Sequence, residues 1–398
     1  MSNILVRSEE PASSVYMKFY LIAGERSGDL HGGNLIKALK SHQPGAYFRG
    51  FGGDYMQSAG MEVVVHYHEL AFMGFAEVLA NLRTISKKLK LCQQDILKYK
   101  PDVIILIDYA GFNMRMAKFA RKNGVKVFWY ISPKVWAWNQ SRALKLKAHV
   151  DRMFVILPFE KDFFKKYDWN VDYVGNPVLD AVRAHQGDEN FLNKNSLKVN
   201  EALVALLPGS RKQELQRIIP LMASVVSKLP NIQFGLAAVD NLSEELYAPL
   251  KGLSNVRFIN NATYDLLTYA QAAIVTSGTA TLETALFQVP QVVVYKTSAF
   301  SYRIAKMAIK VPFISLVNLV AEREVVKELI QDNASEEKTL SELRKILEDS
   351  DYRESILKGY EEIIKILDTG SASENTAKLM MKYLTMSSSP SPLERDLG

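Results

Sequence analysis

The 398-residue sequence contains little cysteine and little histidine: Cys92 is its one cysteine, and six histidines are spread along the chain. A single cysteine excludes an internal disulfide and argues against a cysteine-based zinc site. His66 and His68 alternate on an expected strand, but no third candidate ligand is near them in the sequence. We therefore expect neither a disulfide framework nor a bound metal.

Long apolar runs are also absent. No run reaches the roughly 18 to 20 residues that span a bilayer, and the polar start MSNILVRSEEPASS lacks the apolar core of a signal peptide. With 48% apolar and 23% charged residues, the composition is typical of a globular protein, which we expect in the cytoplasm. The net charge of +6 favours anionic partners, a class that includes nucleic acid, anionic lipid and nucleotide-sugar phosphates.

Two glycine-rich nucleotide fingerprints are missing, G-x-G-x-x-G and G-x-x-x-x-G-K-[ST], which argues against a nicotinamide-dependent dehydrogenase. The stretch AGERSGDLHGG, residues 23–33, nevertheless follows an apolar run and precedes a helical pattern. We expect Gly24 and Gly28 to permit tight turns with positive φ. Open α/β sheets bind ligands where strands end, so the polar residues of this turn are candidate site residues: Glu25, Arg26, Ser27 and Asp29.

Short apolar runs alternate with longer segments of helical period, the pattern of βαβ units. The length and the alternation predict an α/β protein of two doubly wound, Rossmann-like domains that face a cleft and are followed by C-terminal helices. A polar stretch at 183–200 reads as the linker. The expected boundaries are 1–16 (disordered), 17–185 (N-terminal domain), 200–334 (C-terminal domain), 335–384 (helices) and 385–398 (disordered).

Two strand ends in the second half carry anion-binding features. In LPGSRKQEL a Pro-Gly-Ser turn leads into a helix near Arg211, whose fork can hold a phosphate beside backbone N–H groups, although an ordinary surface arginine is the competing interpretation. In TSGTATLE a cap formed by residues 277–279 precedes Glu283, a carboxylate able to accept two ribose hydroxyls. Two such sites on neighbouring strand ends indicate a nucleoside diphosphate.

Three further stretches leave alternatives open. In PDVIILIDYAGFN, Asp108 ends a strand near Asn113 and is a base, a hydrogen-bond organiser or a helix cap. From Phe75 onward, apolar residues including Leu82 recur at helical spacing opposite cations including Arg83, which predicts either a membrane-surface helix or an ordinary surface helix. Trp136 and Trp138 lie near cations that could favour nucleic acid, but a single such stretch ranks that partner low.

These motifs, in this order, resemble the lipid-A-disaccharide synthases, which are inverting glycosyltransferases of the GT-B fold. The resemblance covers residues 18–335 and includes AGERSGDLHG, MGFAEVL, YISPKVWAWNQSR, VGNPVLD and SLVNL. It implies transfer of 2,3-diacylglucosamine from UDP to the 6-hydroxyl of 2,3-diacylglucosamine 1-phosphate, giving a β-1,6-linked disaccharide and UDP. It also implies that no metal or other cofactor takes part.

The resemblance assigns expected roles to residues of this sequence. The N-terminal domain would take the acceptor and contact the cytoplasmic face of the inner membrane, and the helices at 335–384 are compatible with a homodimer. Acceptor or membrane contacts would include Ser27, Met73, Gly74, Glu77, Leu82 and Arg83. Donor contacts would be Gly209, Ser210, Arg211, Ser277, Gly278, Thr279, Glu283 and Asn318.

The general base is the least defined role. Some relatives carry IDAPDFN, with a second acid where this chain has Gly111, and proline is usual where this chain has Val317. We expect Asp108 to act on the acceptor hydroxyl, with Glu25 and Asp29 as rivals. The alternatives are a peptidoglycan N-acetylglucosaminyltransferase, a UDP-N-acetylglucosamine epimerase, and a non-catalytic protein that binds membranes.

Overall fold

The computed structural model describes residues 16–70, 82–138, 140–239, 242–298, 302 and 311–386. The chain divides into two compact units: the first contains the residues up to Pro133, Lys145–Phe154 and the residues from Ser373 on, and the second contains Lys134–Leu144 and Val155–Ala372. The segments expected to be disordered, 1–16 and 385–398, lie almost entirely outside the described residues.

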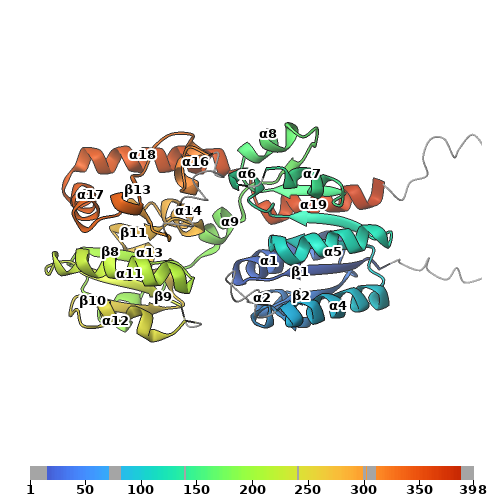
Figure 1. The fold of residues 1–398 in the computed structure, drawn as a ribbon, viewed down its shortest axis with the longest axis horizontal. Helices are drawn as coiled ribbons and strands as arrows, with labels where there is room; N and C mark the ends of the chain where they lie inside the picture. Colours follow the sequence, from blue (N-terminus) through green and yellow to red (C-terminus); the bar gives the residue numbers. More distant parts are fainter. Residues whose placement is uncertain are drawn as a thin grey trace, which may run out of the picture. The chain divides into compact units, whose positions relative to one another are not determined.

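The first sheet has seven strands in the described residues, and the strand pairs from β3 to β6 are parallel. Figure 1 labels β1 and β2 of this sheet. Across the sheet the strands are β3 (Glu62–His66), β2 (Tyr47–Gly52), β1 (Lys18–Ala23), β4 (Val103–Ile107), β5 (Lys126–Tyr130), β6 (Arg152–Val155) and β7 (Asp172–Tyr173). The central strands β1 and β4 are almost fully buried, which explains why their sequences, KFYLIA and VIILI, are nearly continuous apolar runs.

Helices connect these strands. Because the strand order reverses between β1 and β4, right-handed crossovers place the helix after β1 and the helix after β4 on opposite faces of the sheet. The elements are α1 (Arg26–His42), α2 (Asp54–Ser58), η1 (Tyr67–Glu69), α4 (Leu82–Tyr99), α5 (Ala110–Lys122), α6 (Val135–Trp138), α7 (Arg142–Lys147), α8 (Phe159–Lys165) and α9 (Pro177–Ala184).

The second sheet is also parallel, and six strands of it are described. Across the sheet they are β10 (Val256–Asn260), β9 (Gln233–Ala238), β8 (Leu203–Leu207), β11 (Ala272–Thr276), β12 (Gln291–Tyr295) and β13 (Glu328–Ile330). Its connecting elements are α10 (Phe191–Lys194), α11 (Lys212–Ser227), η2 (Glu244–Tyr247), α12 (Ala248–Lys251), α13 (Thr263–Tyr269), α14 (Thr279–Leu286), α16 (Leu316–Ala321) and η3 (Gln331–Asn333).

The predicted linker at 183–200 is not a free connection. Phe191 and Leu197 are buried in the core of the second unit together with Leu203, Ala205 and Leu266. The stretch reads as polar in the sequence because the apolar residues that pack, Phe191, Leu192 and Leu197, are few and spread among polar ones.

The C-terminal segment is helical, as the absence of strand patterns predicts: α17 (Glu336–Glu348), α18 (Ser350–Leu367) and α19 (Ala372–Met386). Whereas α17 and α18 belong to the second unit, α19 belongs almost entirely to the first (Figure 1). The His42 imidazole and the Glu374 carboxylate lie 2.6 Å apart, and the Arg152 guanidinium lies 3.9 Å from the centroid of the Tyr383 ring.

Candidate active site

Strand order defines one favoured ligand position on each sheet. In both sheets the order reverses between two neighbouring strands, β1 and β4 in the first and β8 and β11 in the second, and open α/β sheets bind ligands at such a point. The register pairs Ala23 with Ile107 and Leu207 with Val275. The loops predicted to carry chemistry therefore emerge side by side within each sheet.

Asp108 and Tyr109 leave β4 in a left-handed conformation, with φ angles of 44° and 45°. Two successive non-glycine residues in this region store strain that the surroundings must stabilise. Asn113 does this: its side-chain amide donates to the backbone oxygens of Asp108 at 2.9 Å and of Ile107 at 3.2 Å. Asp108 is half-buried at the switch point of the first sheet, the place where the strand order reverses between β1 and β4, and this position suits a reacting group.

Glu25 lies at the adjacent loop, immediately before α1, and its side chain does not cap the helix. Burial, together with the charge of the Glu25 carboxylate, raises the pKa of the Tyr109 phenol, whose hydroxyl donates to the backbone oxygen of Leu70 at 3.0 Å. The Tyr109 ring packs over Gly24, where a Cβ atom would lie 2.4 Å from it. The structure thus brings Glu25, Tyr109 and the strand end at Asp108 together.

The expected positive φ at Gly24 and Gly28 is wrong, since neither is among the residues with a left-handed backbone. Both glycines instead allow close packing. A Cβ atom on Gly28 would lie 3.3 Å from that of Ala23. The glycines of this turn therefore let α1 approach the sheet and the Tyr109 ring.

Asp29 has a structural role rather than the predicted catalytic one. It is 1% exposed, and its carboxylate accepts the backbone N–H groups of Gly53 at 2.7 Å, Tyr55 at 3.0 Å and Met56 at 3.1 Å. These bonds hold the start of α2, because the first N–H groups of a helix have no partner within the helix. A carboxylate used in this way is poorly suited to accept a substrate proton.

The predicted membrane-contact region is only partly described. Met73, Gly74 and Glu77 lie outside the described residues, Leu82 begins α4, and Arg83 is exposed on it. Farther along α4, Cys92 and Ile96 are buried, so this part of the apolar face packs within the protein. Ser27 is exposed in the first turn of α1.

At the second sheet, Gly209 adopts a φ of 100°, a conformation that favours glycine, and leads to the start of α11. A carboxylate from the chain already occupies this helix start: Glu214 accepts the N–H groups of Ser210 at 3.2 Å and Arg211 at 3.3 Å. Its other oxygen lies 3.6 Å from the exposed Arg211 guanidinium. We missed Glu214 in the sequence, although an acid three residues after a helix start is the signal of a capping box.

The start of α14 differs, because no side chain caps it and Gly278 occupies the N-cap position. The Ser277 hydroxyl, which we expected either to cap the helix or to bind the donor, donates instead to the backbone oxygen of Ile314 at 2.8 Å. No side-chain acceptor therefore occupies the start of α14, and this helix follows β11, the strand that pairs with β8.

Glu283 lies one turn into α14. Burial raises the pKa of its carboxyl group, and a hydrogen bond from the Tyr264 hydroxyl to Oε1, 3.1 Å long, opposes that rise. Tyr295, at the end of β12, also borders the site: burial raises its pKa, the Glu214 carboxylate raises it further, and the Arg211 guanidinium opposes the rise. Sequence reasoning missed both tyrosines, since nothing near them in the chain marks their partners.

Asn318 has no spare hydrogen-bonding capacity for the predicted donor contact. It is fully buried, its amide nitrogen donates to the Val326 backbone oxygen and to Glu328 Oε1, both at 2.9 Å, and its oxygen accepts the N–H groups of Val325 and Val326. The residue closes the loop between α16 and β13. Its role in the structure is therefore to hold this loop.

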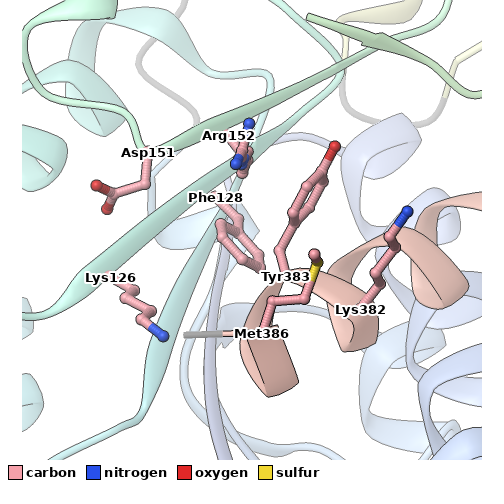
Figure 2. Close-up of a pocket in the computed structure, with 7 residues that line it drawn as sticks. All are labelled: Lys126, Phe128, Asp151, Arg152, Lys382, Tyr383 and Met386. Carbon is pink, nitrogen blue, oxygen red and sulfur yellow. The ribbon is translucent and has the colours of Figure 1, made fainter. Parts of the chain in front are cut away.

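Other candidate features lie away from these sites. A pocket of about 530 Å³ lies near the start of β5 and β6, whereas Asp108 follows the end of β4. Figure 2 shows the residues that line it: Lys126, Phe128, Asp151, Arg152, Lys382, Tyr383 and Met386. The indole N–H of Trp136 donates to the buried Glu160 at 3.2 Å, so this tryptophan fills the core. Within the described residues, no cluster of three or more metal-ligating side chains occurs, and no helix has the length and hydrophobicity of a membrane span.

Two solved structures share this architecture over nearly the whole chain. The UDP-GlcNAc 2-epimerase of Neisseria meningitidis, solved with UDP-GlcNAc bound, has a TM-score of 0.64 at 13% identity and covers 93% of this chain and 100% of its own. The calicheamicin glycosyltransferase CalG4 has a TM-score of 0.60 at 15% identity and covers 94% and 100%. At these identities the likeness concerns the fold, and two doubly wound domains of this kind define the GT-B class.

Sequence comparison is more specific. The lipid-A-disaccharide synthetase family matches residues 19–382. The lipid-A-disaccharide synthase of Geobacter sulfurreducens is 39% identical over 373 residues, which cover 92% of this chain and 97% of that protein. The chain belongs to the lipid-A-disaccharide synthase family, and it is a glycosyltransferase of lipid A disaccharide formation. The resemblance found in the motifs is confirmed.

Proposed function

We propose that the chain transfers 2,3-diacylglucosamine from its UDP conjugate to the 6-hydroxyl of 2,3-diacylglucosamine 1-phosphate, releasing UDP. One observation supports the proposal: an arginine, an uncapped helix start and a half-buried carboxylate follow β8 and β11, the two neighbouring strands at which the strand order of the second sheet reverses. Arg211 and the N–H groups of α14 match a diphosphate, and Glu283 matches the hydroxyls of a ribose.

The proposal assigns the donor to residues 200–334 and the acceptor to residues 17–185. An inverting transfer needs in-line attack on the anomeric carbon, with a base at the attacking hydroxyl and charge stabilisation at the leaving group. The developing charge on UDP is met by Arg211 and by the N–H groups near Thr279, which need no reorganisation during the reaction. Gly209 and Ser210 shape the loop that carries Arg211.

Asp108 is our candidate for the base. The strained backbone that presents it and the Asn113 amide that holds that backbone support this choice. Glu25 is the remaining rival, because it is half-buried at the adjacent strand end and does not cap α1. Asp29 is less suited to this role, since its carboxylate accepts three backbone N–H groups.

The lipid substrates imply work at a membrane surface, and we propose the cytoplasmic face of the inner membrane. The exposed cations Arg83, Lys87 and Lys90 on α4 support electrostatic contact, each contributing about 1 kcal/mol near an anionic surface. We also propose a homodimer formed through the C-terminal helices, where Ile366 on α18 is 43% exposed. Sedimentation of the full chain with and without anionic vesicles tests both proposals.

The decisive experiment is incubation with UDP-2,3-diacylglucosamine and 2,3-diacylglucosamine 1-phosphate, followed by mass spectrometry for the disaccharide and by an assay for UDP. We expect both products in equal amounts, and neither when one substrate is omitted. A second incubation with UDP-N-acetylglucosamine alone tests the epimerase alternative. Conversion of that compound without disaccharide formation from the lipid substrates would overturn the proposal.

A further inference from the structure

Tyr264 and Glu283 come from different helices and meet at the second sheet. Tyr264 lies on α13, which follows β10, whereas Glu283 lies on α14, which follows β11. The Tyr264 hydroxyl donates to Glu283 Oε1 at 3.1 Å. The two residues are 19 positions apart in the sequence, with a complete strand between them, so this contact is a product of the fold.

Aromatic packing fixes the Tyr264 ring. The His185 imidazole meets it edge to face, with centroids 5.5 Å apart, and the Phe287 ring lies 5.0 Å from it. His185 also contacts Phe287 at 5.9 Å, which closes a cluster of three rings. Because the ring is held in this way, its hydroxyl reaches Glu283 at little entropic cost.

We propose that Tyr264 is a positioning residue that orients the Glu283 carboxylate to accept both hydroxyls of a ribose, and that it thereby sets a preference for ribonucleotides over 2′-deoxyribonucleotides. The inference rests on the proposed binding of a uridine nucleotide at this site. A carboxylate has two oxygens with about four lone-pair positions. With one of these occupied by Tyr264 and the rotamer restrained, the remaining positions form a fixed acceptor pair.

The pH dependence of nucleotide affinity is a second test of the inference, because it reports the protonation state of Glu283. Burial raises the pKa of Glu283, and the bond from Tyr264 opposes that rise because it favours the charged form. Ribose recognition needs the ionised carboxylate, so affinity is present above this pKa and falls as the pH drops through it. Loss of the Tyr264 hydroxyl raises the pKa, and the fall in affinity then begins at a higher pH.

Other charged groups near this cluster are themselves paired. His185 Nε2 lies 3.2 Å from Asp265 Oδ1, which also accepts the N–H group of Asp188, and the Asp188 carboxylate pairs with Lys194. Asp265 lies on the same helix as Tyr264, and the His185 ring packs against the Tyr264 ring. The test therefore compares pH profiles between variants that retain this pair.

The experiment measures binding of UDP and 2′-deoxy-UDP to the full chain by calorimetry across pH, for the wild type and for Tyr264→Phe. The matched control is Tyr269→Phe: Tyr269 lies on the same helix, and its hydroxyl donates to the Asp188 backbone oxygen at 3.0 Å. We expect Tyr264→Phe to reduce the preference for UDP about 3- to 10-fold, the net effect of one typical intramolecular hydrogen bond, and to move the pH midpoint upward. We expect Tyr269→Phe to change neither quantity.

The inference is overturned if Tyr264→Phe keeps the wild-type preference and pH midpoint, or if Tyr269→Phe shows the same losses. Glu283→Gln shows whether a negative result concerns the role of Tyr264 or that of Glu283. A preference that disappears in Glu283→Gln but persists in Tyr264→Phe refutes the role of Tyr264 alone. Wild-type UDP binding in Glu283→Gln, without any ribose preference in the wild type, refutes the donor role of Glu283 itself.

Discussion

Replacement of Asp29 tests whether its carboxylate has a structural or a catalytic role. In Asp29→Ala, the N–H groups of Gly53, Tyr55 and Met56 lose their acceptor in a place where water has little access. A hydrogen bond to a charged group contributes about 1.5 to 3 kcal/mol, and an orphaned buried donor costs about 1 to 3 kcal/mol. Since the three bonds share one carboxylate, their losses are not additive, and we expect a destabilisation of about 3 to 5 kcal/mol.

Asp29→Asn keeps one carbonyl acceptor and removes the charge, so we expect a smaller loss of about 1 to 2 kcal/mol. The assay is urea unfolding followed by tryptophan fluorescence, with turnover measured at a temperature at which each variant is folded. Turnover per folded molecule should stay within a few-fold of the wild type. Normal stability combined with a loss of turnover by several orders of magnitude would contradict the capping role and restore Asp29 as a base.

Three other substitutions test the site. Asp108→Ala should lower turnover by about 10² to 10⁴-fold, the contribution of a positioned base, and calorimetry should show unchanged UDP affinity. Near-wild-type turnover would instead favour Glu25 as the base. Arg211→Ala should weaken both UDP affinity and the rate, because it removes a cation from the phosphates, and unchanged UDP binding would show that the phosphates lie elsewhere. Gly111→Asp should raise the free energy of unfolding by about 1 kcal/mol, because a Cβ atom there meets open space and α5 has no acid in its first turn. A lower melting temperature would contradict this reasoning.

The sequence predicts the fold well, because buried parallel strands are nearly continuous apolar runs. KFYLIA and ALVALL mark β1 and β8 within a residue or two. The strands that escape prediction are β7 and β13, two and three residues long, which are too short for a periodic signal. The packing of the stretch at 183–200 gives no signal for a related reason, since the few apolar residues that anchor it are spread among polar ones.

The site is predicted less completely. Strand ends point to Asp108, Glu25, Arg211 and the turn at Gly278, and in each sheet the register places the relevant loops side by side. Strand ends also point to Asp29, and the resemblance points to Asn318, but both side chains bind backbone groups, which a polar residue can do as readily as it binds a ligand. Sequence reasoning also misses Tyr264 and Tyr295, whose partners are brought to them by the fold.

The position of α19 has a consequence for synthesis. Ala377, Met380 and Leu384 are buried on a helix that belongs to the unit formed mostly by the first 133 residues. The ribosome therefore synthesises nearly the whole polypeptide before α19 can complete the first unit. Until then, the apolar surface of that unit that α19 covers stays exposed. Truncation near residue 372 should therefore destabilise the first unit more than the second.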